Sequence, residues 1–428
     1  MTEKPEIAED APRCLITGDL LTAVNNSRAH IIPSALGGRL KPLDVLSKRA
    51  NSELGDTVDQ LLIDALFPIM TQLDGSRDRG RNQPIDVEDA DGRRYRIEFG
   101  KAIQLAVPEY RETEEPDRTV ISVQARTMKE MRTLLGRVRS KVPGFNIEEA
   151  MKHAQVVRSW PTGGGRLRSK LEIGPRRTFP ALFVAASVFS VSKGLPAHPG
   201  LRNYVRTFDV NELAQPPDTF NFYSARPWAT APGEVTHKVV LVADPERGRS
   251  LVFFELFNLL EIAVTLPFAG RRVRVETYGV DVLTGAEVPV TVDVNAILTR
   301  SWEASHDLDP TLWKIIEDRL GRIVGIAQRR GTDDLIRQEL EEVEARLKGD
   351  GPLSARSLLR ALEVPTEYLE IELQRPGMTP ERGREMAEGY AAMLGSTAAL
   401  LPPDQREGLD AALDALIRRI ARAAGLEG

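Results

Sequence analysis

The spacing of apolar residues changes twice along the chain, and this feature constrains the fold more than any other. Up to Asn82, short strand-like stretches are followed by a helical pattern over Val45–Leu66, in which apolar residues recur every three to four positions. Between Ile85 and Trp302 short alternating stretches predominate, which is typical of strands. After Trp302 the periodicity is helical. We therefore expect an α+β protein with a helical C-terminal region.

These changes of pattern divide the chain into three predicted regions. They are a small module over residues 1–82, a central α+β domain with a mainly antiparallel sheet over residues 83–302, and a helical region over residues 303–428. The module is expected to contain short strands at Arg13–Ile16 and Ala29–Ile32. A turn-rich basic stretch, Gly75–Pro84, marks its end.

The elements of the two larger regions follow from turn and cap signals. The Asp91-Gly92 pair predicts a hairpin turn beside a strand at Arg93–Phe99, and Thr127–Val142 is expected to be a helix. The further strands are expected at Thr119–Val123, His237–Val242, Leu251–Phe254, Glu261–Leu266 and Arg271–Tyr278. The C-terminal helices are expected at Pro310–Ala327, Asp333–Leu347, Ser354–Leu362, Thr379–Leu394 and Asp404–Ala424.

The composition limits the partners that the chain can have. Its 57 basic and 62 acidic residues give a net charge of −5, so attraction to phosphate must come from local patches. The most apolar stretches, Phe179–Val191 and Leu251–Phe268, are too short or too charged to span a bilayer, and each is expected to be a buried helix or strand. The N-terminus lacks the apolar core of a secretory signal. We expect a cytoplasmic protein with no membrane partner.

An ordered set of short motifs lies in the first region. They are Cys14-Leu-Ile-Thr17-Gly18, Arg28-Ala29-His30-Ile31-Ile32-Pro33, Leu36-Gly37-Gly38 and Ser47-Lys-Arg-Ala50-Asn51-Ser-Glu-Leu-Gly55. This set resembles the HNH endonuclease family, and in particular the branch with an acidic-His-Ile-Ile-Pro strand, a Leu-Gly-Gly turn and a Cys-Asn helix start. The resemblance covers under a fifth of the 428 residues. It implies that the module has the ββα-metal fold of that family.

The resemblance also implies where a structural zinc would bind. In the family, two Cys-x-x-Cys pairs supply four thiolates that hold the metal tetrahedrally. The four matching positions here are Cys14, Thr17, Ser47 and Ala50. Because three of the four thiolates are missing, we expect no structural zinc. Apolar residues such as Ile16, Leu46 and Leu54, and docking on the next domain, must stabilise the module instead.

The catalytic positions of the family are only partly kept. His30 matches the histidine that deprotonates the attacking water, and Asn51 matches the polar residue beside the metal. Ala29 replaces the acidic residue that would bind Mg²⁺ or Mn²⁺, so this degenerate site would hold either metal poorly. Asp56 and Asp59 are the nearest acids that would replace it, or they are exposed charges on a helix. Taken alone, Asn51 is also a typical helix N-cap, and His30 a typical half-buried structural residue.

Basic residues suggest a nucleic-acid surface outside the motif. Arg166, Arg168 and Lys170 follow the flexible Gly163–Gly165 loop and are the candidate contacts to phosphate. Arg126–Lys141 carries six basic residues and one acid, and Arg77–Arg81 is also basic. The alternative for all three stretches is an ordinary solvated surface.

Three functions remain open on the sequence alone. The first, which Ala29 and the lost thiolates favour, is a pseudo-enzyme related to HNH nucleases that binds DNA or RNA with weakened or lost phosphodiester hydrolysis. The second is an active metal-dependent endonuclease with His30 as general base. A carboxylate within about 5 Å of the His30 imidazole would favour this second function, because metal ligands converge on one point. The third is a sensor or protein-interaction role of the larger C-terminal region.

Overall fold

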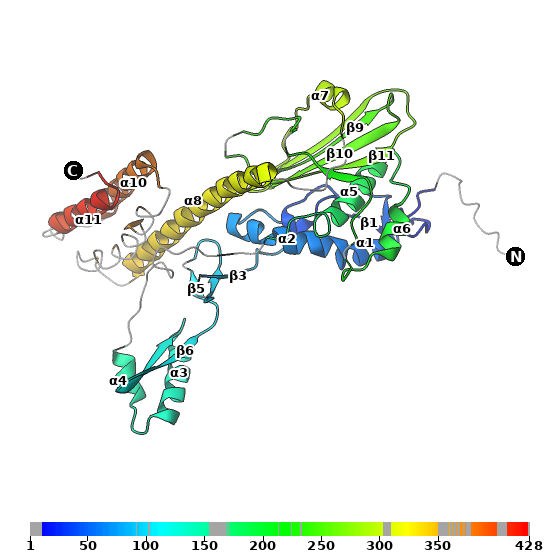
Figure 1. The fold of residues 1–428 in the computed structure, drawn as a ribbon. Coiled ribbons are helices and arrows are strands. Elements are labelled where there is room, and N and C mark those ends of the chain that lie inside the picture. The colour runs from blue at the N-terminus through cyan, green and yellow to red at the C-terminus, as the bar shows by residue number, and fades with distance from the viewer. Residues whose placement is uncertain are drawn as a thin grey trace. The chain divides into compact units, whose positions relative to one another are not determined.

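A computed structural model of the chain describes residues 11–90, 92–101, 103–153, 168, 171–212, 214–223, 225–231, 233–302, 310–349, 359, 362, 366, 369–370, 373, 378–399 and 409–426. It confirms an α+β protein with antiparallel sheets and a helical C-terminal region (Figure 1). The chain divides into two compact units, one of Met1–Gln83 with Lys170–Gln328 and one of Pro84–Ser169 with Arg329–Gly428. No helix among the described residues is long and apolar enough to cross a membrane.

A five-stranded antiparallel sheet organises the first unit. Its strand order is β12-β9-β10-β11-β8. The strands are β8 (Thr219–Asn221), β9 (Thr236–Asp244), β10 (Arg249–Leu256), β11 (Leu260–Pro267) and β12 (Arg274–Asp281). All of β9 and nearly all of β10 is buried, because both faces of the sheet are covered. The four strands predicted between His237 and Tyr278 are thus confirmed.

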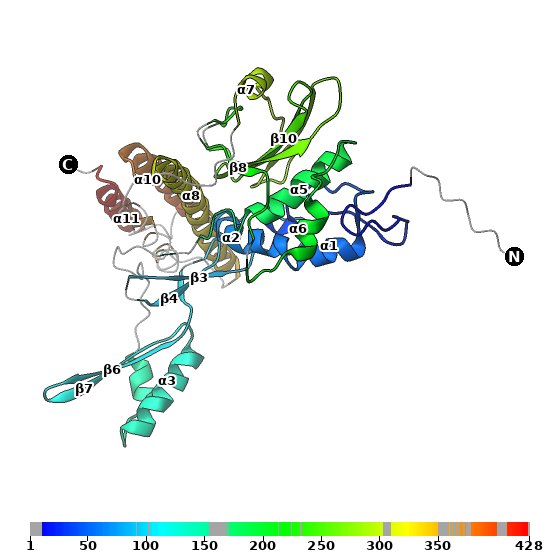
Figure 2. The same ribbon diagram turned by 45° about the vertical axis from the view of Figure 1, so that its right-hand side comes forward.

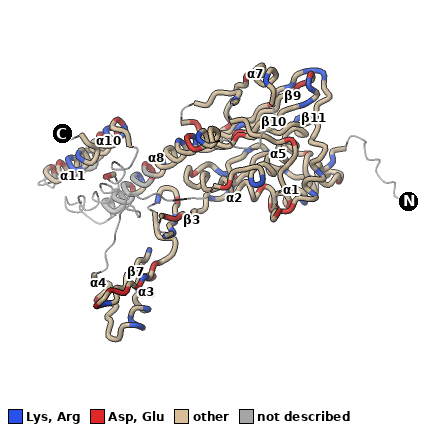
Figure 3. The backbone as a smooth tube through the Cα atoms, viewed as in Figure 1, with Lys and Arg blue, Asp and Glu red and all other residues tan. Residues whose placement is uncertain are grey.

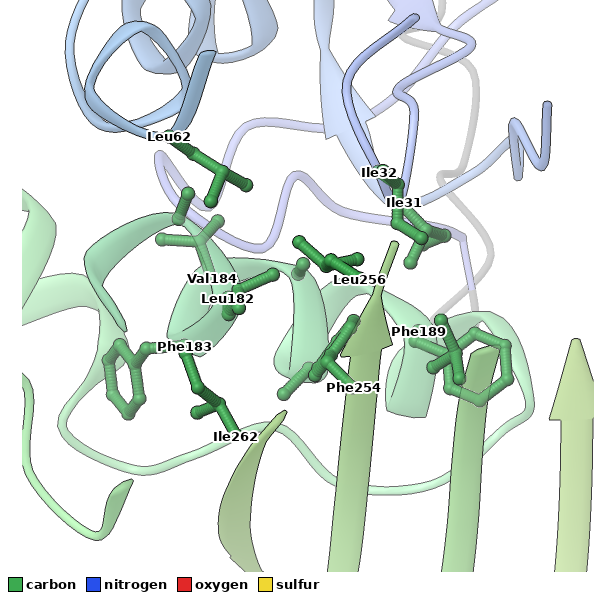
Figure 4. Close-up of a cluster of buried hydrophobic side chains, with 14 of the residues drawn as sticks. Ile31, Ile32, Leu62, Leu182, Phe183, Val184, Phe189, Phe254, Leu256 and Ile262 are labelled. Carbon is green, nitrogen blue, oxygen red and sulfur yellow. The ribbon is translucent and has the colours of Figure 1, made fainter. Parts of the chain in front are cut away.

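Helix α5 (Phe179–Ser192) is the middle layer of the first unit. Residues 179–190 are all buried, as expected of a helix that is apolar on every side. It packs on β10 and β11 and, on its other side, on α2 (Val58–Leu73) (Figure 2). Figure 4 shows Leu62 of α2 on one side of α5 and Phe254 and Ile262 of the sheet on the other. The predicted module and the sheet therefore share one hydrophobic core.

The module consists of short elements around a single small strand pair. They are β1 (Asn26–Ser27), the 3-10 helix η1 (Ser34–Leu36), β2 (Leu46–Ser47), α1 (Lys48–Gly55) and α2. β1 and β2 pair antiparallel. The single helix predicted over Val45–Leu66 is wrong at its start, where Leu46–Ser47 is strand β2. The rest is two helices, because Thr57 adopts a non-helical conformation between them.

The two strands predicted in the module are wrong. Arg13 makes only an isolated bridge to Leu20, and Ala29–Ile32 is irregular. Ile31 and Ile32 are both buried, at 1% exposure, although they are adjacent. Consecutive residues of a strand point to opposite faces, whereas here a bend of the backbone at Ile31 and Ile32 brings both side chains into one core.

Two buried carboxylates explain the acidic residues in the apolar stretch Leu251–Phe268. Glu255 and Glu261 lie directly opposite each other in β10 and β11, and both are fully buried. Arg226 contacts them at 2.7 Å and 2.6 Å, and Arg319 contacts Glu261 at 2.6 Å. A buried acid needs such partners because an unpaired charge in the core costs several kcal/mol.

Helix α8 (Pro310–Gly349) is continuous where two helices were predicted, at Pro310–Ala327 and Asp333–Leu347. Its residues Ile316 and Ile323 belong to the core of the first unit. The shorter helices of this unit are α6 (Leu201–Thr207) and α7 (Val294–Thr299).

The second unit contains hairpins and helices. Its strands are β3 (Ile85–Glu88), β4 (Arg94–Ile97), β5 (Gln104–Leu105), β6 (Glu109–Glu115) and β7 (Arg118–Gln124). Its further helices are α3 (Met128–Lys141), α4 (Ile147–Lys152), α10 (Pro380–Ala398) and α11 (Leu409–Ala423). The hairpin predicted at Asp91-Gly92 joins β3 to β4, with Asp91 itself outside the described residues. Most of the predicted helix Ser354–Leu362 also lies outside them.

Candidate functional site

The four positions that match the zinc ligands of the HNH family come together in the structure. The Cys14 thiol is fully buried and accepts a hydrogen bond from the Ser47 backbone N–H at 3.3 Å. Ser47 is the N-cap of α1, and its hydroxyl accepts from the Ala50 N–H at 3.2 Å. Burial raises the pKa of the Cys14 thiol, but hydrogen bonds from Ser47 and Thr17 outweigh it and hold the pKa below its ordinary value. A hydrogen-bonded thiol and a helix cap thus occupy this place.

His30 lies at the centre of a charged cluster, which we call the His30 cluster and define as His30, Arg39, Lys41 and Asp78. The His30 Nε2 atom is 3.5 Å from the Asp78 Oδ2 atom. The Arg39 Nη1 atom is 3.2 Å from Asp78 Oδ1, and the Lys41 ammonium contacts Asp78 Oδ2 directly. All four side chains are between 22% and 28% exposed. The Asp78 carboxylate therefore pairs with both cations, and all four side chains are partly exposed to solvent.

The edge strand β12 fixes the two loops that carry the cluster. The Tyr278 hydroxyl oxygen accepts from the backbone N–H groups of Arg39 at 3.0 Å and Leu40 at 3.2 Å. The carbonyl of Val282, just after β12, accepts from the Ser76 N–H at 2.7 Å. The loop before β2 and the loop after α2 are thus both anchored to the sheet, and Arg39 and Asp78 are brought together.

The Leu-Gly-Gly turn positions these loops for steric reasons. Gly37 has a φ of +91°, in the left-handed region that favours glycine. A Cβ atom on Gly38 would lie 1.8 Å from the Ile32 carbonyl oxygen, so no larger residue fits there. His237 of β9 fixes the same turn, since its Nε2 atom lies 2.6 Å from the Leu36 carbonyl oxygen. The glycines let the chain reverse tightly between His30 and Arg39.

The charges of the cluster determine its protonation state. Burial lowers the pKa of His30, the positive charge of Lys41 lowers it further, and Asp78 opposes both only in part. A hydrogen bond from Lys41 holds the pKa of Asp78 below its ordinary value. At neutral pH the imidazole is neutral and the carboxylate ionised. Two cations and one anion leave a net positive charge beside a group that accepts protons.

The donor set of the cluster does not fit the Mg²⁺ or Mn²⁺ of the family. Ala29 is only 2% exposed and lies in the hydrophobic core, so its position supplies no ligand. Asp78, the carboxylate that pairs with His30 within the described ranges, is already paired with two cations that would repel a metal. Over the part of the chain that the structure describes, no three His, Cys, Asp or Glu residues group to hold a metal. Hard divalent cations need several oxygen ligands.

The structure does not join Asn51 to His30. Asn51 is half-buried within α1, and no hydrogen bond among the described residues connects the two side chains. The alternative interpretation of Asn51 as the N-cap is wrong, because Ser47 has that role. Asp56 is exposed after α1, and burial raises the pKa of Asp59 in α2 to about 7. Neither has a hydrogen bond or ion pair to His30 within the described ranges.

The predicted nucleic-acid patch is only partly described. Arg166 and Lys170 lie outside the described residues, whereas Arg168 is exposed and its backbone pairs with Glu88. In the basic stretch Arg126–Lys141, three cations pair with acids. Figure 3 shows Lys and Arg interspersed with Asp and Glu along the described chain. These contacts weaken the case for α3 as a basic surface.

Three residues of the His30 cluster escaped sequence reasoning. Arg39 and Lys41 lie just beyond the Leu-Gly-Gly turn, and Asp78 lies in the stretch that was interpreted as a boundary. The one local signal for Asp78 is the density of charge at Arg77–Arg81, whose basic residues predict a phosphate-binding stretch and not a partner for His30.

No protein-family model, curated protein or solved structure matches this chain. The geometry of the site therefore carries the functional argument.

Proposed function

We propose that this chain is an HNH-like, nucleic-acid-binding protein whose metal-dependent phosphodiester hydrolysis is weakened or lost. The observation that carries the proposal is the His30 cluster, where Arg39 and Lys41 outnumber the single anion Asp78. Lys41 has three N–H donors, and Asp78 takes one of them, so the ammonium can also bind a phosphate oxygen. We further propose a cytoplasmic location.

The cysteine-centred cluster supports descent from an HNH module. Thr17 and Ser47 both contact Cys14, and the Ala50 N–H is hydrogen-bonded to the Ser47 hydroxyl. The first pair of positions, 14 and 17, thus meets the second pair, 47 and 50, although the two pairs lie far apart in the sequence. If the motifs resembled the HNH family only by chance, the four positions that match its zinc ligands would have no reason to lie together in the folded chain. Loss of a structural zinc during divergence would leave this arrangement.

Binding can be tested without metal. Fluorescence anisotropy of a labelled single-stranded oligonucleotide in EDTA should show binding that weakens steeply with salt. Lys41→Ala should lower the affinity several-fold and reduce the salt slope by about one. Lys314→Ala is the matched control, since Lys314 is an exposed lysine on α8 in the same unit. Absence of binding, or equal binding by the Lys41 and Lys314 variants, would overturn the proposal.

A second candidate function is an active metal-dependent endonuclease with His30 as base. The observation in its favour is the 3.5 Å separation of His30 and Asp78, which puts one carboxylate beside the imidazole, although Arg39 and Lys41 already pair with that carboxylate. The variant Asp78→Asn separates the two functions. An endonuclease that used Asp78 as a ligand would lose Mg²⁺-dependent cleavage. A phosphate-binding protein would instead bind nucleic acid more tightly, because Lys41 and Arg39 are released from their anion.

A further inference from the structure

The His30 cluster contains the groups that phosphodiester cleavage needs in the absence of a metal. It has a neutral imidazole, a carboxylate 3.5 Å from one ring nitrogen, and two cations in contact with that carboxylate. Cleavage of DNA requires an external water molecule as nucleophile and, in the HNH family, a metal ion that polarises the scissile phosphate. RNA carries its own nucleophile, the 2′-hydroxyl, beside each phosphorus atom, and such an intramolecular attack has a large advantage in effective concentration.

We propose that the His30 cluster cleaves single-stranded RNA by metal-independent transesterification and leaves DNA intact. This inference rests on the proposed function, since a phosphate must first bind to Lys41 and Arg39. The O2′–P bond forms and the P–O5′ bond breaks. The proton of the 2′-hydroxyl passes to His30 and is returned through solvent to the departing 5′-oxygen. The products are a 2′,3′-cyclic phosphate and a 5′-hydroxyl, and no oxidant, water or metal is consumed.

The geometry gives each residue a role. Nε2 of His30 is buried and lies 3.5 Å from the Asp78 Oδ2 atom. The negative charge of that carboxylate favours the tautomer protonated at Nε2, which leaves the lone pair of Nδ1 to accept the proton. Lys41 and Arg39 stabilise the charge that develops on the phosphoryl oxygens. Asp78 acts through His30 and is a positioning residue, whereas His30 is the catalytic residue.

The test uses the full-length protein in EDTA with three labelled 20-mers of the same sequence: RNA, DNA and 2′-O-methyl RNA. We expect cleavage of the RNA alone, with products that carry the cyclic phosphate. His30→Ala should lower cleavage at least about 100-fold while binding remains. His153→Ala is the matched control, because His153 lies on the surface of the other unit, with its side chain 78% exposed. Equal cleavage by the wild type and by the His30→Ala and His153→Ala variants would point to a contaminating nuclease and would overturn the proposal.

Separate measurements of RNA binding and RNA cleavage distinguish this inference from the proposed function on which it rests. RNA that binds but stays intact would overturn the inference and leave the proposed function standing, whereas absence of binding would overturn both. Cleavage that requires Mg²⁺, or that cuts DNA equally, would also overturn it. For Asp78→Asn we expect the acidic limb of the pH profile of kcat/KM to move to lower pH, because Asp78 raises the pKa of His30. An unmoved limb would contradict the positioning role.

Discussion

At the scale of single residues, the two histidines His30 and His237 contrast sharply. His30 is a quarter exposed and its neighbours are charged. His237 is fully buried, lies 2.6 Å from the Leu36 carbonyl through Nε2 and accepts from the Phe257 N–H through Nδ1. Those two bonds fix one neutral tautomer and leave no room for a second proton. The first histidine is the one that we propose exchanges protons, and the second holds the Leu-Gly-Gly turn on the sheet.

Because His237 is buried, we expect the free energy of unfolding to fall in mild acid. Burial lowers its pKa from 6.5 to about 4, so the unfolded chain takes up a proton more readily than the folded one. The contribution of neutral, hydrogen-bonded His237 to the free energy of unfolding is complete above pH 6.5 and is lost as the pH falls toward 4. At about 1.36 kcal/mol per pKa unit the loss is on the order of 3 kcal/mol. In thermal melts between pH 7.5 and 4.5, the melting temperature of the His237→Gln variant should fall less steeply than that of the wild type. Equal declines would show that His237 does not contribute.

Because Ala29 is buried, we expect that substituting it with an acid cannot restore the Mg²⁺ or Mn²⁺ site of the HNH family. Ala29→Asp would place a carboxylate in the core and should lower the free energy of unfolding by about 3 kcal/mol or more. Ala23→Asp, at an exposed position of the same module, is the control and should have little effect. Urea denaturation measures both. A stable Ala29→Asp protein that gains Mg²⁺-dependent cleavage would mean that residue 29 faces the site.

The sequence was a partial guide to these residues. It identified His30, because the histidine lies in a local motif. It did not indicate Asp78, which approaches His30 only because β12 anchors both loops through Tyr278 and Val282. A contact that depends on a strand some 200 positions away has no local signature in the chain.

At the scale of elements, caps and periodicity were the informative signals. α3 begins after Thr127, whose hydroxyl accepts from the Glu130 N–H, as its predicted start requires. α5 was ambiguous, because a stretch that is apolar throughout has the period of neither a helix nor a strand. The segment at Ile31 and Ile32 has the composition of a strand, but its backbone bends, and composition does not reveal that bend.

The start of α1 predicts that a zinc site can be rebuilt. Elemental analysis of the wild-type protein should find no stoichiometric zinc. The variant Thr17→Cys, Ser47→Cys, Ala50→Cys should bind about one zinc per chain, because Thr17 and Ser47 already contact Cys14 and Ala50 is hydrogen-bonded to Ser47. Adding Cys14→Ser to that variant should weaken the binding strongly. Zinc in the wild type, or no zinc in the triple variant, would contradict this account of the module.

At the scale of the whole molecule, a net charge of −5 requires any nucleic-acid contact to be local. The His30 cluster supplies one such place in the first unit. Arg166, Arg168 and Lys170 remain a predicted second place.

Replacing all three of Arg166, Arg168 and Lys170 by Ala should weaken binding to every oligonucleotide sequence about equally, since phosphate contacts carry no base information. Anisotropy titrations over a range of salt concentrations measure the effect. Binding unchanged by the triple substitution would make that stretch ordinary solvated surface.

The central claim is that nucleic-acid phosphate binds beside His30, and its most direct test is NMR of the protein labelled at its five histidines. The signal of each histidine is assigned from the variant that lacks it. On addition of a non-cleavable 2′-O-methyl oligonucleotide in EDTA, the His30 signal should shift and its pKa should rise, because a phosphate anion favours the imidazolium. The signals of His153 and His237 should stay in place. An unmoved His30 signal at saturating oligonucleotide would contradict the account.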